Sequence, residues 1–127
     1  MDCFVSNSAL MLRRSMDFLW TKQSCILDNI ANAETPGYKT KYATFEESLQ
    51  EAIQSASHKG STAKEIRSAI QGADISVEQA QENTRLDENG VNITEQMVEL
   101  ARNGYQMQYV MDAINSDFSL LRTAIKG

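Results

Sequence analysis

Few residues of this sequence have the types and spacing that catalysis requires. The only histidine, His58, lies in a Ser- and Gly-rich stretch without a nearby Asp or Cys, which is typical of a solvated loop. The paired acids Glu46 and Glu47 fall at a predicted helix start, where carboxylates are usually solvated. Because the sequence also lacks a glycine-rich phosphate loop and a nucleophile elbow, we expect a protein that is not an enzyme and needs no cofactor.

Residue spacing also disfavours a metal site and a disulfide. The stretch from Asp87 resembles a calcium loop, but an EF-hand requires Gly at its sixth position and Glu at its twelfth, where this sequence has Asn92 and Val98. Cys3 and Cys25, placed on one helix, would lie about 33 Å apart, far beyond the ~7 Å limit for bridging their Cα atoms. We therefore predict two free, packed thiols and no metal.

The composition is that of an acidic chain without a membrane-spanning segment. Its 127 residues include 12 Lys and Arg against 17 Asp and Glu, a formal net charge of −5, and 42% are hydrophobic. This acidity argues against a nucleic-acid-binding module, which is usually basic. No run approaches the ~20 apolar residues of a transmembrane helix. Arg13-Arg14 interrupt the place where a secretory signal would be apolar, so we do not expect export by the Sec route.

Hydrophobic residues near the two ends of the chain recur in alternating steps of three and four. Such a heptad pattern predicts helices that pack along a narrow apolar seam. The first predicted seam, in which only Gln23 is polar, comprises Val5, Ala9, Leu12, Met16, Leu19, Gln23, Ile26, Ile30 and Ala33. The second, in which Gly104 is the only gap, comprises Met97, Leu100, Gly104, Met107, Met111, Ile114, Phe118, Leu121 and Ile125. Two ordinary amphipathic helices of a globular bundle are the alternative.

Helix length favours an elongated subunit. A helix from Ser6 to Ala33 would span roughly 42 Å and one from Thr94 to Lys126 roughly 50 Å, whereas a compact domain of this size has a diameter of about 36 Å. We therefore predict a mainly α fold, with coiled-coil-like pairing of an N-terminal helix (1–33) and a C-terminal helix (94–127). A short irregular middle segment (34–93) completes this single axial unit.

The middle segment carries turn and capping signals. Pro36-Gly37 predicts a type II turn after the first helix. The capping boxes at Thr44–Glu47 and Thr62–Glu65 predict two short helices, of which the first has an apolar face formed by Phe45, Leu49, Ala52, Ile53 and Ala56. The polar stretch from Gly72 to Asn92 predicts extended chain with a small hairpin, and its last residue is a predicted cap of the C-terminal helix.

Large apolar residues also lie outside the two seams. Phe4, Met11 and Phe18 recur every seven residues, one position before seam residues and so about 100° around the helix from them. Pairing the two long helices with each other would leave such rows uncovered, and rows of exposed apolar side chains mark interfaces. We therefore predict contacts with neighbouring subunits through Phe4, Met11, Phe18, Trp20, Tyr105 and Tyr109.

The residues at the end of the first predicted helix resemble a known family signature. The bacterial flagellar rod and hook axial proteins carry the signature N-I-A-N-x-x-T-P-G-Y. This chain matches it without a break through Asn29, Ile30, Ala31, Asn32, Thr35, Pro36, Gly37 and Tyr38. Paired terminal heptad helices are a second feature of that family, so the resemblance extends to both ends of the chain.

Within that family, the chain is similar to the short proximal rod members. Arg85–Asn92 followed by Glu95–Ala101 resembles their R-L-D-G-N-x-V-D … E-M-x-E-L-A pattern, although Glu88 replaces the usual Gly. Where other rod and hook proteins carry an R-A-Y-E-A-N-like motif, this chain has Asn103–Gln108. The resemblance implies a structural subunit of the flagellar basal-body rod, which assembles through its terminal helices, transmits torque and surrounds the export channel.

The resemblance also implies partners and a location. The partners are copies of itself, other proximal rod proteins of the FlgC and FlgF types, the junction protein FliE, the inner-membrane ring and the flagellar type III export apparatus. No nucleic acid and no small-molecule substrate is implied. The location is the rod in the cell envelope, reached by type III export without a Sec signal peptide. The alternatives are an FlgC-like rod protein and, in another class, a cytosolic helical secretion chaperone or adaptor.

Overall fold

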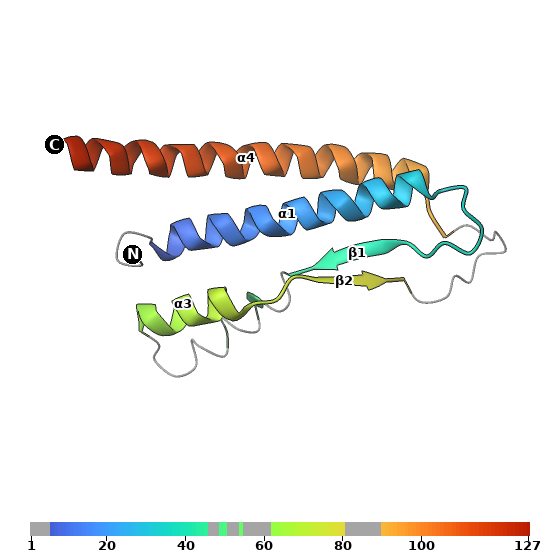
Figure 1. Cartoon of the computed structure of the whole chain (residues 1–127), viewed down its shortest axis with the longest axis horizontal. Coiled ribbons are helices and arrows are strands. Elements are labelled where there is room, and N and C mark those ends of the chain that lie inside the picture. The colour runs from blue at the N-terminus through green and yellow to red at the C-terminus, as the bar shows by residue number, and fades with distance from the viewer. Residues whose placement is uncertain (1–5, 46–48, 51–53, 55–61, 81–89) are drawn as a thin grey trace.

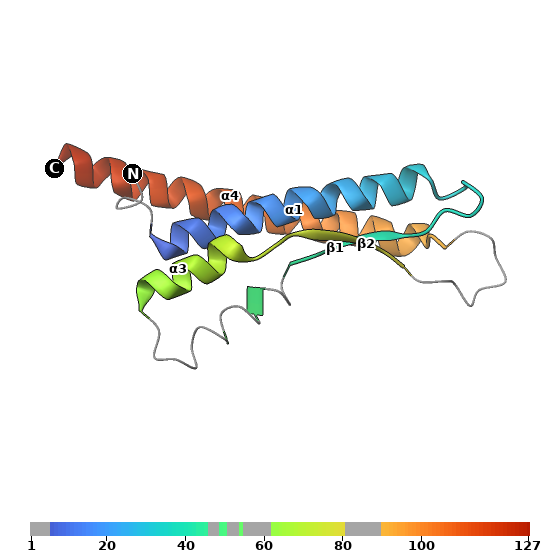
Figure 2. The same cartoon turned by 60° about the horizontal axis from the view of Figure 1, so that its bottom comes forward.

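Two long helices, a two-stranded sheet and a short helix form an elongated molecule in this computed structural model (Figure 1). The structure describes residues 6–45, 49–50, 54, 62–80 and 90–127. The elements in chain order are α1 (Asn7–Ala31), β1 (Lys41–Thr44), α3 (Ala63–Gly72), β2 (Ser76–Gln79) and α4 (Ile93–Lys126). α4 runs antiparallel along one side of α1, and β1, β2 and α3 lie on another side (Figures 1 and 2). The mainly helical fold with paired terminal helices is therefore confirmed.

Side-chain caps set the helix starts, and the sequence predicts those of α3 and α4 but not that of α1. Ser6 Oγ accepts a hydrogen bond of 3.0 Å from the backbone N–H of Ala9 at the start of α1. Asn92 Oδ1 accepts one of 3.2 Å at the start of α4, and the backbone N–H of Thr62 donates to Glu65 Oε2 at 2.8 Å before α3. Each cap satisfies a donor that the first helical turn leaves without an intrahelical partner.

The two strands that pair are far apart in the sequence, with α3 between them. β1 and β2 are antiparallel, with Lys41 opposite Gln79 and Thr44 opposite Ser76. The extended stretch predicted after Gly72 thus supplies β2, while its partner β1 follows the Pro-Gly turn, where no strand was predicted. β1 has only four residues, so the alternation of its side chains is a weak signal in the sequence. Its position beside β2 depends instead on the packing of β1 against α1.

A small apolar core lies between α1, α3 and the residues that follow β1. It comprises Leu10, Phe45, Leu49, Ile70 and Ala73, with Met11, Phe18, Ile66 and Ile75 packed around it. The Phe45 ring stacks on Phe18 with 5.6 Å between centroids, and the Arg14 guanidinium lies 5.5 Å from the Phe45 centroid. Phe45 and Leu49 are thus buried as predicted, while the other predicted members of their helix face, Ala52, Ile53 and Ala56, lie outside the described residues.

We expect Phe45→Ala to lower the free energy of unfolding by about 3 to 5 kcal/mol, because it removes a ring that is 2% exposed and leaves a cavity beside Phe18. Urea unfolding followed by circular dichroism measures this loss. Tyr42→Ala, at a half-exposed ring on the neighbouring strand, should cost much less. Equal losses for the two variants would show that this cluster is not the core.

Candidate assembly interface

Asn29, the first residue of the family signature, is a buried centre of hydrogen bonding. Its side chain is 1% exposed. Its Nδ2 donates to the carbonyl O of Lys41 at 2.8 Å and to Gln96 Oε1 at 3.0 Å. Its Oδ1 accepts from the backbone N–H of Lys41 at 2.8 Å and from the Tyr38 hydroxyl at 3.2 Å. One carboxamide therefore uses both donors and both acceptor positions to join the end of α1, the start of β1 and the first turn of α4.

The rest of the signature forms the turn that ends α1. Asn32 Nδ2 donates to the carbonyl O of Asp28 at 2.8 Å, and the Thr35 hydroxyl donates to Asn32 Oδ1 at 3.2 Å. The Tyr38 N–H donates to the carbonyl O of Thr35 at 3.2 Å, and Gly37 has a φ of 72°. A glycine with positive φ at this position defines a type II turn, so the predicted turn is confirmed. Burial raises the pKa of the Tyr38 phenol, which favours the protonated form that donates to Asn29.

A second polar contact links α1 and α4 near their middle. Asn103 is completely buried, and its Nδ2 donates to the carbonyl O of Leu19 at 3.0 Å and to Gln23 Oε1 at 2.8 Å. Gln23, the one polar residue in the first predicted seam, is therefore opposite a polar partner. Sequence reasoning missed Gln96 and Asn103, although their seven-residue spacing on α4 was a readable signal. A buried amide in a helix pair fixes the register of the two helices.

These amides turn a different face of α4 toward α1 from the one predicted. The buried residues of α4 are Gln96, Asn103 and Val110, each one position before a residue of the predicted seam. Of that seam, Leu100, Met107 and Ile114 are half-buried, whereas the exposed members are Met97, Gly104, Met111, Phe118, Leu121 and Ile125. The α1 seam residues Leu12, Met16, Leu19, Ile26 and Ile30 are all buried or half-buried. Val5 lies outside the described residues.

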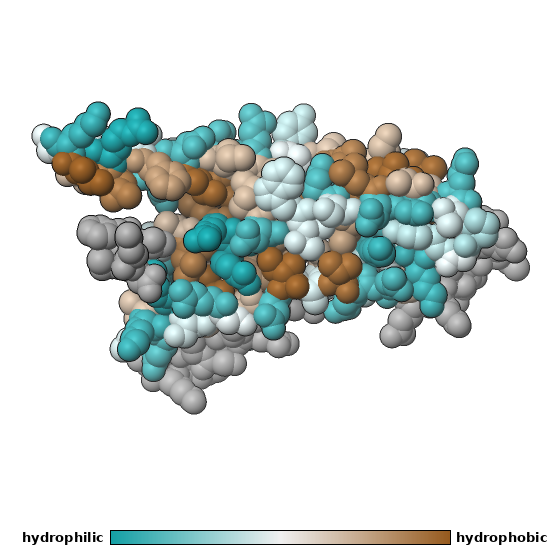
Figure 3. Space-filling view, viewed as in Figure 1, coloured by the Kyte–Doolittle hydropathy of each residue, from teal (hydrophilic) through white to brown (hydrophobic). Residues whose placement is uncertain are grey.

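The residues predicted to face neighbouring subunits divide into two groups. Met11 and Phe18 pack within the chain around the apolar core, because β1 and the residues after it fold back over this face of α1. Trp20, Tyr105 and Tyr109 are exposed, and Phe4 lies outside the described residues. Figure 3 shows apolar groups exposed at both ends of α4. The contacts of these exposed residues with neighbours stay a prediction.

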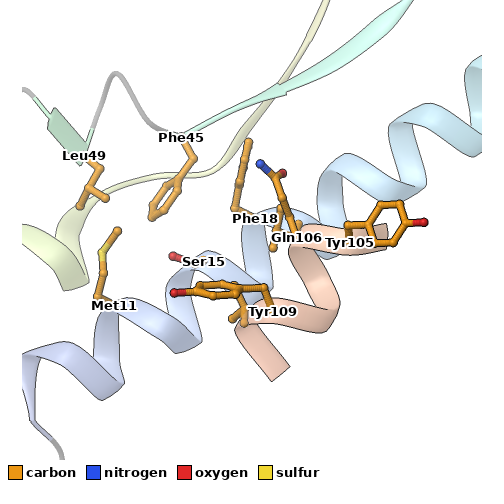
Figure 4. Close-up of a pocket in the computed structure, with 10 residues that line it drawn as sticks. Met11, Ser15, Phe18, Phe45, Leu49, Tyr105, Gln106 and Tyr109 are labelled. Carbon is orange, nitrogen blue, oxygen red and sulfur yellow. The ribbon is translucent and has the colours of Figure 1, made fainter. Parts of the chain in front are cut away.

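An apolar groove opens between α1, α4 and the core. Its volume is about 410 Å³, and its lining includes Met11, Phe18, Phe45, Leu49, Tyr105 and Tyr109. Figure 4 shows the Phe18 and Phe45 rings side by side, with the Tyr109 ring near Ser15 and the Tyr105 ring pointing away from the two phenylalanines. The lining is mostly carbon, so the groove is suited to an apolar side chain or helix face and not to a charged ligand.

Cys25 is the cysteine in the described part of the chain, and its thiol is free. Cys25 is buried, and burial together with the nearby Asp28 raises the pKa of its thiol, which disfavours the nucleophilic thiolate. Among the described residues, no three His, Cys, Asp or Glu side chains are grouped closely enough to hold a metal ion. No helix in the described ranges is long and apolar enough to cross a membrane.

Comparison with known proteins identifies the family. Over 114 residues, 84% of this chain and 83% of the relative, the sequence is 30% identical to the flagellar basal body rod protein FlgB of Bacillus subtilis (strain 168). The chain belongs to the FlgB family. FlgB of Aeromonas hydrophila is 31% identical over 102 residues, 78% of this chain and 77% of that protein. FlgB of Borrelia hermsii is 46% identical over 43 residues, 34% and 32% of the two chains.

Membership of the FlgB family agrees with the signature and with the similarity to proximal rod proteins that the sequence shows. No protein-family model matches the chain. The FlgB relatives do not favour the FlgC-like alternative or the chaperone. In this family member, the signature residues have a structural role. Asn29, Thr35 and Tyr38 form hydrogen bonds that hold the turn between α1 and β1, and Gly37 adopts its positive φ.

We expect Asn29→Ala to release β1 from α1. The Lys41 N–H loses its acceptor and Gln96 Oε1 loses its donor, and each buried polar group left unpaired costs about 1 to 3 kcal/mol. Hydrogen exchange at the Lys41 amide should therefore accelerate at least about tenfold. Asn32→Ala removes a neighbouring signature amide but leaves the Lys41 acceptor in place, so it is the matched control. Unchanged Lys41 protection in Asn29→Ala would contradict the role of this residue.

Alanine at two glycines should change stability in opposite directions. Gly37→Ala should lower the free energy of unfolding by about 1 to 2 kcal/mol, because an L side chain is strained at a φ of 72°. Gly104→Ala should raise it by about 0.5 to 1 kcal/mol, because Gly104 lies inside α4 and an added Cβ meets nothing within 4 Å. Urea unfolding of both variants measures the two shifts. A stabilising Gly37→Ala would argue against the turn geometry.

Proposed function

We propose that this FlgB-family protein is a structural subunit of the flagellar basal-body rod that assembles through its terminal helices. The observation that carries the proposal is the exposed apolar surface of α4 in a chain whose relatives are rod proteins. Met97 and Met111 are exposed side chains outside the contact with α1. They lie within the continuous helix α4, whose backbone groups are hydrogen-bonded within the helix. Exposed apolar rows of this kind mark interfaces.

The fold suits a load-bearing role. α4 is one uninterrupted helix of 34 residues, about 50 Å long. It is locked to α1 by the buried pairs Asn29–Gln96 and Gln23–Asn103 and by the Lys22–Glu99 ion pair at 3.1 Å. Fixed register between the two helices means that a force on one is transferred to the other, as torque transmission along a rod requires.

The neighbours proposed for the subunit are those of a proximal rod protein. They are copies of itself, FlgC-like and FlgF-like rod proteins, the junction protein FliE, the inner-membrane ring and the export apparatus. The protein acts without catalysis in the rod of the basal body, which it reaches by type III export. Residues 1–33, 34–93 and 94–127 together form one axial unit, with Trp20, Tyr105 and Tyr109 facing neighbours.

We expect Met111→Asp to abolish motility while leaving the isolated subunit folded. Met111 is half-exposed and outside the contact with α1, so a charge there is tolerated in the monomer but is buried without a partner when helices of neighbouring subunits pack on it. Complementation of a strain that lacks FlgB, scored by swimming and by isolation of basal bodies, measures the effect. Ile114 is less informative, because it is already half-buried in the single chain.

The matched control is Ser116→Asp, which adds the same charge at an exposed polar position of the same helix, about 140° around it from Met111. This variant should swim like the wild type. Circular dichroism of both purified variants checks that each retains its helices. Normal swimming of Met111→Asp would contradict assembly through this face of α4, and failure of the wild-type gene to restore motility would contradict the rod function itself.

A further inference from the structure

The C-terminal end of α4 projects beyond the start of α1. The pairs Asn29–Gln96 and Gln23–Asn103 show how the antiparallel helices align, and continuing that alignment brings Asn7 level with roughly residue 119 of α4. Figure 1 shows the C-terminal end of α4 extending past the start of α1. The last two turns of α4 therefore have no part of α1 beside them.

This projecting end, which we call the tail (118–127), carries an apolar face. Phe118, Leu121 and Ile125 are exposed, with Phe118 at 64% and Ile125 at 78%. They follow one another at i, i+3 and i+7, which places them on one side of a helix. Three large apolar residues at this spacing are what a helix presents when it binds in an apolar groove.

The chain also contains a groove of matching character. The groove between α1, α4 and the core has a volume of about 410 Å³ and is lined by Met11, Phe18, Phe45, Leu49 and Tyr109 among others. Tyr109 at its edge is 75% exposed, so an incoming helix can reach this side of the groove. Figure 4 shows the Tyr109 ring near Ser15. Tyr109, at the groove, and Leu121, in the tail, are about 18 Å apart along α4.

We propose that the tail of one copy of this chain docks in the groove of a second copy. The proposal rests on the function proposed above, because it specifies one contact between rod subunits. Burial of the Phe118, Leu121 and Ile125 side chains against the aromatic groove provides the driving force. A contact of this size is weak by itself, which suits a subunit that is monomeric until many contacts form together in an assembly.

Charge favours a second copy as the occupant. The tail contains Arg122 and Lys126 and no acidic side chain. Without these two residues, the chain retains ten Lys and Arg against 17 Asp and Glu, a formal charge of −7. A basic tail is therefore attracted to the acidic body of another copy, whereas two bodies repel each other. Such attraction should weaken as salt screens it.

The contact joins two different surfaces, so it is head-to-tail. The copy whose tail is docked still has an empty groove, and the copy whose groove is filled still has a free tail. Further copies can therefore add in the same way. Repetition of such a heterologous contact generates either a ring or an open helical assembly. This symmetry distinguishes the proposal from a closed twofold dimer, which would stop at two copies.

Sedimentation of the purified full chain tests the proposal. The wild type should form dimers and longer species as its concentration rises from about 1 μM to about 1 mM, and less so at high salt. Ile125→Asp should raise the dissociation constant at least about tenfold, because it removes a buried anchor. Leu120→Asp is the matched control, since Leu120 is also exposed on the tail, at 70%, but lies at least about 100° around the helix from the docking face.

Mixing two defective variants gives the decisive measurement. Ile125→Asp retains a groove, and Tyr109→Asp retains a tail, so each alone should be monomeric and their mixture should form a 1:1 dimer that does not extend. Both positions are exposed, and circular dichroism verifies that the variants are folded. A mixture that stays monomeric, or a wild type that stops at a closed dimer, overturns the proposal.

Failure of the docking is separable from failure of the rod function. A wild-type chain that stays monomeric up to about 1 mM overturns the docking of tail in groove. If the same chain restores motility to a strain without FlgB, the rod function holds and its subunits contact one another through other surfaces. An Ile125→Asp chain that associates like the wild type also overturns the docking, whatever its motility.

Discussion

The pairing of α1 with α4 through buried carboxamides is the constraint on which the rest of the structure depends. Asn29 meets Gln96 near one end and Asn103 meets Gln23 near the middle. An unpaired amide buried between helices would cost about 1 to 3 kcal/mol, so a slip of either helix is penalised twice. Apolar side chains alone impose no such penalty, because they tolerate several registers. The amides therefore determine which face of α4 is covered.

Covering that face leaves the large apolar residues of α4 exposed in the single chain. Met97 and Met111 lie beside the contact, Phe118 lies level with the start of α1, and Ile125 lies beyond it. A globular protein would bury these groups in its own core, and the acidic polar surface around them keeps the subunit from associating without specificity. Stability of the single chain is thus limited, while the surface available to neighbours is large, as expected of a subunit that completes its packing in an assembly.

The signature at the end of α1 has a physical explanation in this framework. Asn29 needs β1 beside it to satisfy its side chain, and β1 reaches that place only because the turn at Pro36-Gly37 reverses the chain. The same reversal brings Phe45 onto α1, where it covers Met11 and Phe18. Turn, amide cluster and apolar core are therefore one cooperative unit, and a change in the signature affects surfaces distant from it.

The sequence by itself determined the two long helices, the cap of the second, the type II turn and the family, because these depend on local signals: heptad spacing, the Asn92 cap, Pro36-Gly37 and an unbroken motif. Only the tertiary structure decided the pairing of β1 with β2 and the face that α4 turns toward α1. The reason is that apolar spacing locates the buried face of a helix only to within about one residue. The hydrogen-bond partners of Asn103 and Gln96 determine which of two adjacent faces packs against α1. Whether Met11 contacts a neighbouring subunit or the core of its own chain likewise depends on the position of Phe45 in the fold.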